Sequence, residues 1–390
     1  MSARTNRLYV IGFVALLFGM SVLLLLLPKK SFSETENRLL QGLPELSWEA
    51  IKDKEFSKDA ESYVTDHFPW RDKWVALKSE AEQLRLQQEN NGIYKDKDGY
   101  LFEKFEEPAW EKVASYAEAV RKFAESHSDA KISFLLAPTS VGLYPERLPW
   151  LASSYSEEKV NDFIGSIVSE SGTDSGTGSR SVSFLNGFDF LKPAAGEDLY
   201  YRTDHHWTTR GAYLAYAAFA RSMGWSVKPE SDFDIRTVTD SFLGSFHTKS
   251  QFSGAKPDTI EQYVPKKPAA SEMTVADDGT KMEGLYAESY LSKKDKYSYF
   301  LGGVHALSEI RTELAPEDVS LDKLLVVKDS YAHSVLPFLA LHVPDIHVID
   351  IRYYNGSIAD YMAENDIENV LLLFNTATFV STPELLKLNN

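Results

Sequence analysis

Two short segments of the chain carry the residues that can do chemistry. The first runs from Tyr200 to Thr208 and places Asp204 two positions before His206. If this segment is extended, Asp204 and His206 project to one face and His205 to the other. In many nucleophilic sites a carboxylate orients an imidazole, and the imidazole acts as the general base. The alternative is a polar, aromatic turn that satisfies itself through hydrogen bonds.

The second segment runs from Lys323 to Ser334. An apolar stretch ends in Asp329-Ser330, and a helical sequence follows. A strand that turns into a helix at a serine lifts the hydroxyl out of the sheet's carboxyl edge, beside amides that can hold an oxyanion. Asp-Ser before a helix is also an ordinary N-cap. With Asp204 and His206, Ser330 would complete a serine triad, provided that the two segments meet in space.

Three other readings of these residues stay open. Asp204, His205 and His206 with a remote His305 or His333 form a possible zinc or iron ligand set, although adjacent histidines normally point apart. A glycosidase needs paired carboxylates, and no pair in this acidic chain is selected by its spacing. A non-catalytic glycan-binding or cell-wall assembly protein would keep the fold with an idle site, and the aromatic content of 13% suits carbohydrate stacking as well as a core.

The elements that must position these residues alternate along the chain. Short apolar runs predict strands at 132–137, 324–327, 346–351 and 370–374, and helical patterns fall at 71–88, 110–126, 331–341 and 357–365. Such alternation predicts an α/β fold, with a parallel sheet and helices on both faces.

The remaining segments lack this rhythm. We expect a hairpin at 93–102, irregular chain at 31–70, a flexible loop at 169–181 and an irregular insertion at about 227–300.

Composition excludes several classes of protein. The chain of 390 residues has no cysteine, which removes disulfides, thiolate metal sites and a cysteine nucleophile. Its 57 acidic and 41 basic residues give a net charge of -16, so no nucleic-acid partner is expected. With 43% hydrophobic and 25% charged residues, the composition is that of a globular protein.

The first thirty residues differ from the rest. Positions 8–27 form an uncharged run of 20 residues, long enough to span a bilayer and flanked by Arg4, Arg7, Lys29 and Lys30. No small-residue cleavage site follows it, which favours an uncleaved N-terminal anchor at the cell membrane over a signal peptide. Because basic residues flank both ends, the positive-inside rule alone does not settle the orientation. Without these four cations, 37 of the 41 basic residues remain against 57 acidic residues, a net charge of -20, and the chain has no second such run, which favours an N-terminus-in anchor with an exported body.

The motif Asp204-His205-His206-Trp207 resembles the one that names the DHHW family, which is similar to the SGNH-hydrolase-like O-acetyltransferases of alginate and other exported bacterial polysaccharides. The resemblance covers nearly all of the exported chain. Its supporting segments are 36–38, 66–71, 99–102, 294–303, 328–331 and 352–355.

The resemblance implies a reaction and a set of residues. Ser330 would be the nucleophile, His206 the general base and Asp204 its orienting carboxylate, with no metal or other cofactor. Candidate substrate-binding residues are Tyr331, Arg352, His305 and Trp207. Relatives often carry Asn where this chain has Val304 and His333, which leaves the oxyanion-hole residues open.

The sequence therefore predicts an anchored, exported O-acetyltransferase or acetylesterase. It would act on an extracellular or cell-wall polysaccharide through an acetyl-serine, and a membrane-bound O-acyltransferase is the implied acetyl donor. The expected organisation is an anchor at 1–30, an extension at 31–105 and an SGNH-like catalytic domain at 106–390.

Overall fold

The computed structural model describes residues 3–30, 32–33, 38–44, 46–85, 87–169, 182–276 and 278–389. The chain divides into two compact units, Met1–Asn91 with Thr248–Gly254, and Gly92–His247 with Ala255–Asn390. Most of the segment expected to be a loop at 169–181, and Glu36 and Asn37, lie outside the described residues.

The first unit is mainly helical. Its helices are α1 (Ala3–Leu26), α2 (Trp48–Lys52), α3 (Glu55–Asp66) and α4 (Arg71–Leu84), and its short strands are β1 (Phe32–Ser33), β2 (Arg38–Leu39) and β3 (Glu89–Asn90). Within α1, residues Arg7–Leu26 are long and apolar enough to cross a membrane, a test that anchors and signal sequences pass alike.

The expectation of an irregular chain at 31–70 was wrong for α2 and α3. In α3 the apolar residues Phe56, Ala60 and Tyr63 recur at helical spacing and are half-buried. Polar residues fill most of the other positions, so this short stripe gave only a weak pattern. The helix expected at 71–88 is present as α4.

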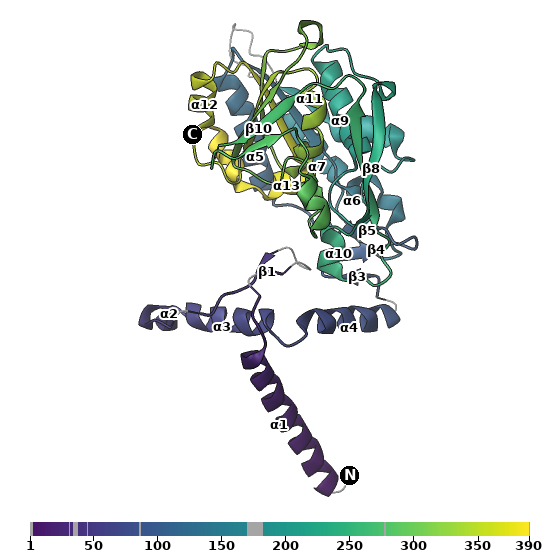
Figure 1. Ribbon diagram of the computed structural model, residues 1–390, viewed down its shortest axis with the longest axis vertical. Helices are drawn as coiled ribbons and strands as arrows, with labels where there is room; N and C mark the ends of the chain where they lie inside the picture. The colour runs from purple at the N-terminus through teal and green to yellow at the C-terminus, as the bar shows by residue number, and fades with distance from the viewer. Residues whose placement is uncertain are drawn as a thin grey trace. The chain divides into compact units, whose positions relative to one another are not determined.

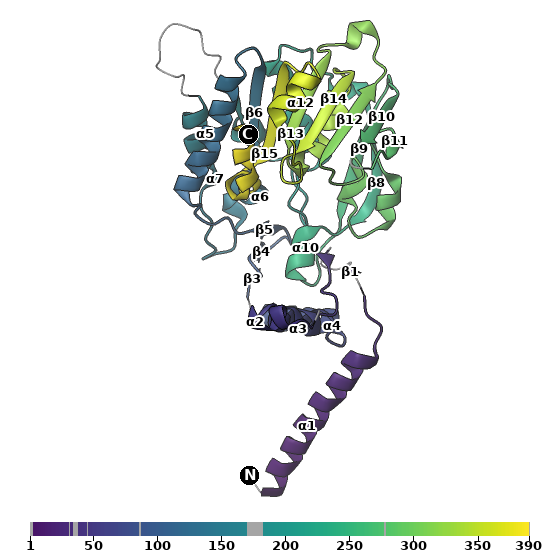
Figure 2. The same ribbon diagram turned by 90° about the vertical axis from the view of Figure 1, so that its left-hand side faces the viewer.

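The second unit is built on one eight-stranded sheet, seen face-on in Figure 2, with the order β11-β10-β12-β14-β13-β15-β6-β7. Its strands are β6 (Lys131–Ala137), β7 (Ser183–Asn186), β10 (Ser271–Val275), β11 (Lys281–Glu283), β12 (Leu307–Thr312), β13 (Lys323–Lys328), β14 (Asp345–Asp350) and β15 (Asn369–Asn375). Neighbouring strands from β14 to β7 run parallel, and β12, β10 and β11 continue the sheet in antiparallel pairs.

The predicted α/β class is confirmed, but the sheet is mixed. Residues 271–283, expected inside an irregular insertion, form β10 and β11 at its edge. These strands pair antiparallel with their neighbours and therefore need no intervening helix, so the helix–strand alternation that revealed the parallel strands is missing there.

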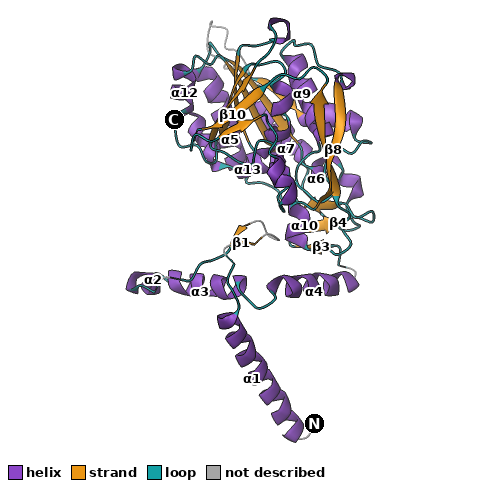
Figure 3. Cartoon of the chain, viewed as in Figure 1, coloured by secondary structure: helices purple, strands orange, loops and turns teal. Residues whose placement is uncertain are grey.

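Helices cover both faces of the sheet. In Figure 1, α5 and α12 lie on one side of the sheet and α9 and α11 on the other. Figure 3 shows the same arrangement for α5, α12 and α9. The helices of this unit are α5 (Trp110–Ser126), α6 (Ser140–Leu143), α7 (Glu157–Val168), α8 (Gly187–Leu191), α9 (Thr209–Ser222), α10 (Ser245–Ser250, shared with the first unit), α11 (Leu336–Leu339), α12 (Ile358–Glu364) and α13 (Thr376–Ser381).

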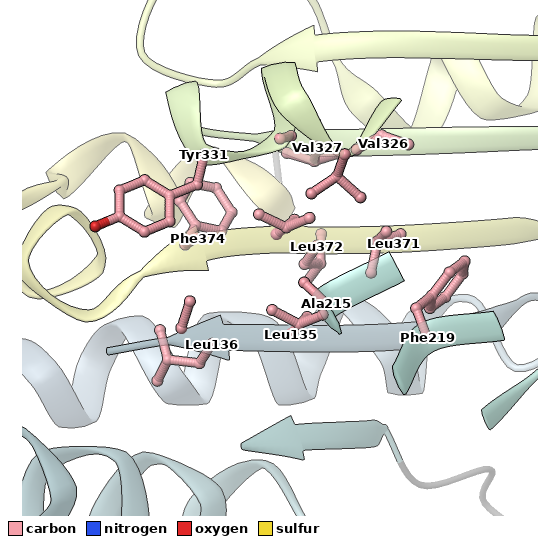
Figure 4. Close-up of a cluster of buried hydrophobic side chains, with 14 of the residues drawn as sticks. Leu135, Leu136, Ala215, Phe219, Val326, Val327, Tyr331, Leu371, Leu372 and Phe374 are labelled. Atoms are coloured by element: carbon pink, nitrogen blue, oxygen red, sulfur yellow. The ribbon is translucent and has the colours of Figure 1, made fainter. Parts of the chain in front are cut away.

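The core lies where the parallel strands meet these helices. Figure 4 shows apolar side chains of β13, β15 and β6 in contact with one another and with α9: Val326, Val327, Leu371, Leu372, Leu135, Ala215 and Phe219. Strands buried on both faces read as continuous apolar runs, which is why they could be predicted.

Two smaller hairpins complete the unit. The hairpin expected at 93–102 is present as β4 (Ile93–Lys95) and β5 (Leu101–Glu103). Strands β8 (Phe233–Phe242) and β9 (Asp258–Pro265) pair outside the main sheet. Beside them a separate apolar cluster encloses Tyr297 together with Tyr201, Phe242, Ile260, Tyr299 and Phe300.

Candidate active site

Ser330 lies at the carboxyl end of β13, in the middle of the sheet. It begins the 3₁₀ turn η7 (Ser330–Ser334), and the Asp329 carboxylate caps this turn by accepting the Tyr331 N–H at 2.8 Å. The carboxyl edge of parallel strands is where α/β proteins place their reactive groups. The expected strand-to-helix serine is therefore present.

Asp204, His206 and Ser330 form one continuous hydrogen-bonded chain. His206 Nε2 is 2.8 Å from Ser330 Oγ, and His206 Nδ1 is 2.5 Å from Asp204 Oδ1. The three residues come from segments more than 120 positions apart, and the side chains of Asp204 and His206 are buried. The structure thus brings together the three residues that the sequence had placed only in two separate segments.

The motif segment is a turn and not the extended chain that was expected. The Tyr201 N–H donates to the His206 carbonyl at 3.2 Å and closes the turn. Asp204 Oδ1 accepts the backbone N–H of His206 at 3.0 Å in addition to its ring nitrogen. An aspartate that bonds the backbone two residues on stabilises such turns, so the spacing in Asp-x-His has a local cause.

Asp204 is held as an anion. Its second oxygen, Oδ2, accepts the Ser245 N–H at 2.7 Å, and a Cβ on Gly244 would lie 2.2 Å from the Asp204 Cβ, so only glycine fits there. Burial alone would raise the pKa of Asp204, but the adjacent His205 and His206 imidazoles and these hydrogen bonds hold that pKa well below its usual range. The carboxylate is therefore suited to orient His206.

His205 does not point away from His206, contrary to expectation. The two ring centroids are 3.7 Å apart, and His205 Nδ1 lies 2.7 Å from Ser245 Oγ. Its side chain remains 39% exposed. Partial burial and the neighbouring His206 lower the pKa of His205 to about 4, so it is neutral at pH 7. The turn places both rings on the same side, which the alternation of an extended chain does not allow.

Tyr297 supports the other face of His206. The rings stack at 3.5 Å between centroids with an interplanar angle of 9°, and the Tyr297 hydroxyl contacts the Ser330 carbonyl and Ser334 Oγ at 3.2 and 3.1 Å. This residue lay in a segment of the family resemblance but had no assigned role. It lies in a short 3₁₀ turn between Lys296 and Phe300, and nothing local marks it as part of the site.

Two residues predicted to bind substrate belong to the packed interior. Trp207 is completely buried, and its Nε1–H lies 3.0 Å from both the Tyr331 carbonyl and Ser334 Oγ. It joins the motif turn to η7 and does not face a substrate, so that prediction is corrected. Tyr331 is also buried, with its hydroxyl donating to the His205 carbonyl, although its ring lines a cavity.

Arg352 and His305 do not contact the triad. Arg352 binds Asp350 through Nε and Nη2 at 2.8 and 2.7 Å, and its side chain is 26% exposed. His305 Nε2 lies 3.1 Å from the Leu301 carbonyl. Arg352 is therefore committed to a carboxylate of the protein, and a role for either residue in substrate binding remains a prediction.

The sequence reasoning missed a clamp behind Ser330. Asp329 Oδ2 accepts both the backbone N–H and the Nδ2–H of Asn375, at 2.8 and 2.7 Å. Asn375 is the last residue of β15, so the clamp ties the serine turn to the neighbouring strand. Burial raises the pKa of Asp329, opposed by these donors. A polar residue directly after the apolar run 370–374 was the available signal.

A cavity of about 270 Å³ opens beside the triad, on the side of His205 and Tyr331. Its other lining residues are Glu103, Lys104, Phe105, Thr139, Glu157, Phe246, Asn375, Ala377, Thr378 and Ser381. Burial raises the pKa of Glu157 to about 7, although both of its oxygens accept hydrogen bonds from Thr139. Three aromatic rings (Phe105, Phe246 and Tyr331) with hydroxyl, amide and carboxyl groups are the kind of lining that binds a hydroxylated ligand.

Among the residues that the structure describes, Asp204, His205 and His206 are the group that could hold a metal ion. One ligand atom from each lies within 4.8 Å of the others. The nitrogen and oxygen atoms concerned are hydrogen-bonded within the protein, to Ser245, to Ser330 and to one another. A metal ion would have to break the hydrogen bonds that link Asp204, His206 and Ser330. These side chains therefore fit a serine triad better than a metal site.

The fold and the site define a mixed α/β protein with a Ser-His-Asp chain at the carboxyl edge of its sheet. In comparisons with known proteins, residues 176–349 match the family model described as DHHW protein. The predicted resemblance to the DHHW family is thereby confirmed over these residues. A comparison with curated proteins finds no match.

Solved structures share the fold. A DHHW family protein from Eubacterium siraeum is 23% identical, with a TM-score of 0.64 over 77% of this chain and 96% of that chain. Bacillus cereus PatB1 is 19% identical, with a TM-score of 0.61 over 74% and 96%. A second PatB1 structure, with a sulfonyl adduct, is 18% identical, with a TM-score of 0.58 over 74% and 97%. At these identities the likeness concerns the fold.

Proposed function

We propose that the protein is a serine O-acetyltransferase or acetylesterase that acts on an extracellular or cell-wall polysaccharide. The observation that carries this proposal is the unbroken chain from Asp204 through His206 to Ser330, with distances of 2.5 and 2.8 Å. A nucleophile, a base and an orienting carboxylate in this order perform acyl transfer on several unrelated folds.

The reaction has two balanced halves. His206 Nε2 takes the Ser330 proton while Oγ attacks the acetyl carbonyl of the donor, and the donor alcohol leaves with that proton. In the second half, His206 takes a proton from a sugar hydroxyl or from water, whose oxygen attacks the acetyl-serine. Ser330 then leaves and recovers the proton. The cavity beside His205 provides room for the sugar.

We further propose that α1 is an uncleaved anchor and that the body lies outside the cytoplasm. Acetyl-CoA is absent there, so a membrane-bound O-acyltransferase would hand the acetyl group across the membrane. Protease added to intact cells should digest the body and leave α1 in the membrane. Protection of the body, or a soluble form that begins near residue 31, would contradict this topology.

The catalytic proposal is tested with the full-length chain in detergent. After exposure to an aryl acetate, peptide mass analysis should find one acetyl group on Ser330, and an aryl sulfonyl fluoride should label the same residue. Ser330→Ala should lose both labels and ester turnover, and Ser115→Ala, a change on the exposed side of α5, serves as the control. A parent protein with neither label nor turnover that still binds glycans would support the non-catalytic alternative.

A further inference from the structure

A second buried cluster of charged groups lies directly behind Ser330. Lys328, the last residue of β13, has an almost completely buried side chain, and its Nζ lies 2.8 Å from His333 Nε2 and 3.0 Å from Asp350 Oδ2. The parallel register of β13 and β14 pairs Lys328 with Asp350. The proposed reaction uses none of these groups, although burying a lysine is costly unless it is paired.

The pairing with Asp350 favours the ammonium form of Lys328. Burial would raise the pKa of Asp350, but Arg352 and Lys328 hold it below its usual value, so Asp350 is a carboxylate. Burial lowers the pKa of Lys328, and this carboxylate opposes that shift. Lys328 and Asp350 form an ion pair, and Arg352 binds the same carboxylate through two nitrogens, so the buried charges are paired.

The ammonium fixes the tautomer of His333. An ammonium only donates, so Nε2 of His333 must accept and the ring proton resides on Nδ1. The His333 side chain is buried, and the ring hydrogen bond that the structure shows for it, to Lys328, uses Nε2. Nδ1–H is therefore the donor that this bond leaves over.

His333 and Ser330 share one face of the η7 turn. Residues three positions apart in a 3₁₀ helix lie one above the other, and η7 spans Ser330–Ser334. The ring of Tyr297, which stacks on His206, also runs nearly parallel to the His333 ring at 6.3 Å between centroids. The His333 ring therefore lies on the same side of the turn as the reacting serine.

We propose that the Nδ1–H of His333, polarised by Lys328, donates a hydrogen bond to the oxyanion that forms when Ser330 is acylated and deacylated. The inference rests on the function proposed above and adds the group that stabilises its tetrahedral intermediate. No proton is transferred: the ammonium draws electron density from Nε2, and Nδ1–H becomes a stronger donor. A preorganised donor of this kind lowers the barrier because it interacts with charge that is present only near the transition state.

Three variants of His333 separate this role from packing. His333→Phe keeps an aromatic ring without a donor, His333→Asn keeps an N–H donor in a smaller side chain, and His333→Ala keeps neither. Loss of one oxyanion donor should lower kcat for an aryl acetate by about 10²- to 10³-fold in His333→Phe and His333→Ala, with KM little changed. His333→Asn should retain at least about tenfold more activity than either. A packing role predicts the opposite order, with Phe above Asn.

Lys328→Met tests the polarisation. It should lower kcat by roughly tenfold, as expected when a charge-assisted hydrogen bond loses its charge, while the rate of Ser330 labelling by a sulfonyl fluoride falls in parallel. Lys323→Met, at the other end of β13, is the matched control. If Lys328→Met is as active as this control, the polarisation is refuted.

The outcomes also separate this inference from the proposed function. An active, acetylated parent whose His333→Phe variant keeps full kcat overturns the oxyanion role alone. A parent that is neither acetylated nor active overturns both proposals. If His333→Phe fails to fold by its melting curve, the comparison of His333→Asn with His333→Ala decides, and equal activity of these two refutes the role.

Discussion

The two buried histidines His206 and His333 lie near Ser330 and have partners of opposite charge. His206 Nδ1 faces the Asp204 carboxylate, whereas His333 Nε2 faces the Lys328 ammonium. A carboxylate accepts the Nδ1–H and leaves Nε2 to accept a proton, while an ammonium donates to Nε2 and leaves the ring proton on Nδ1. The same side chain therefore becomes a base in one place and a fixed N–H in the other, and the partner residue decides which.

The largest effect is expected when the anionic partner of His206 is removed. Asp204→Asn keeps the shape that Gly244 accommodates but removes the charge and favours the wrong ring tautomer. We expect ester turnover to fall by roughly 10³- to 10⁴-fold. Asp258→Asn is the control, because Asp258 holds the same turn through Arg202 and Thr203 without contacting His206. Similar kinetic losses in the two variants would show that Asp204 acts only by holding the turn.

The loss of folding stability at acid pH should show the effect of the cationic partner of His333. Burial and the adjacent Lys328 hold the pKa of His333 well below that of an unfolded histidine. Below about pH 6.5 the unfolded chain therefore binds a proton that the folded chain refuses, and this residue lowers stability as the pH falls.

His333→Asn should remove that contribution. Between pH 7.5 and 5 its melting temperature should drop by roughly 2–4 °C less than that of the parent. His127→Asn, at the C-terminal end of α5, controls for the loss of a histidine as such. An identical drop in His333→Asn and in the parent would mean that His333 is protonated in the folded protein.

Tyr297 lies next to both rings, and its substitution should have an intermediate effect. Tyr297→Phe keeps the stack on His206 and loses only the contacts of the hydroxyl, so kcat should stay within about threefold of the parent. Tyr297→Leu loses the stack and should lower kcat by roughly three- to tenfold more. If Tyr297→Phe is the more damaging variant, the hydroxyl and not the ring supports the site.

Only a small effect is expected at His205. It lies against His206 but bonds Ser245 and neither Ser330 nor a charged partner at hydrogen-bond distance. His205→Ala should lower kcat by no more than about tenfold, against about 10²- to 10⁴-fold for His206→Ala. A chelator should leave the parent unaffected. Equal losses in both variants together with inhibition by the chelator would favour a metal site over the serine mechanism.

The sequence by itself determined the local features of this protein. The strands at β6, β13, β14 and β15 were predictable because a buried strand is a continuous apolar run, whatever lies beside it. Asp204-x-His206 and Asp329-Ser330 were recognisable because the spacing within each pair is set by a short turn or a cap. The N-terminal apolar helix follows from its composition alone.

The tertiary structure decided everything that depends on which segments meet. The antiparallel strands β10 and β11, the stack of Tyr297 on His206 and the orientation of His205 come from long-range packing, for which no periodicity exists. The pairing of Lys328 with Asp350 depends on the register of two strands, and a shift of one residue would turn that carboxylate to the other face. The local sequence thus determines which reactive groups are present. The register of the sheet and the long-range packing determine which partner each group meets.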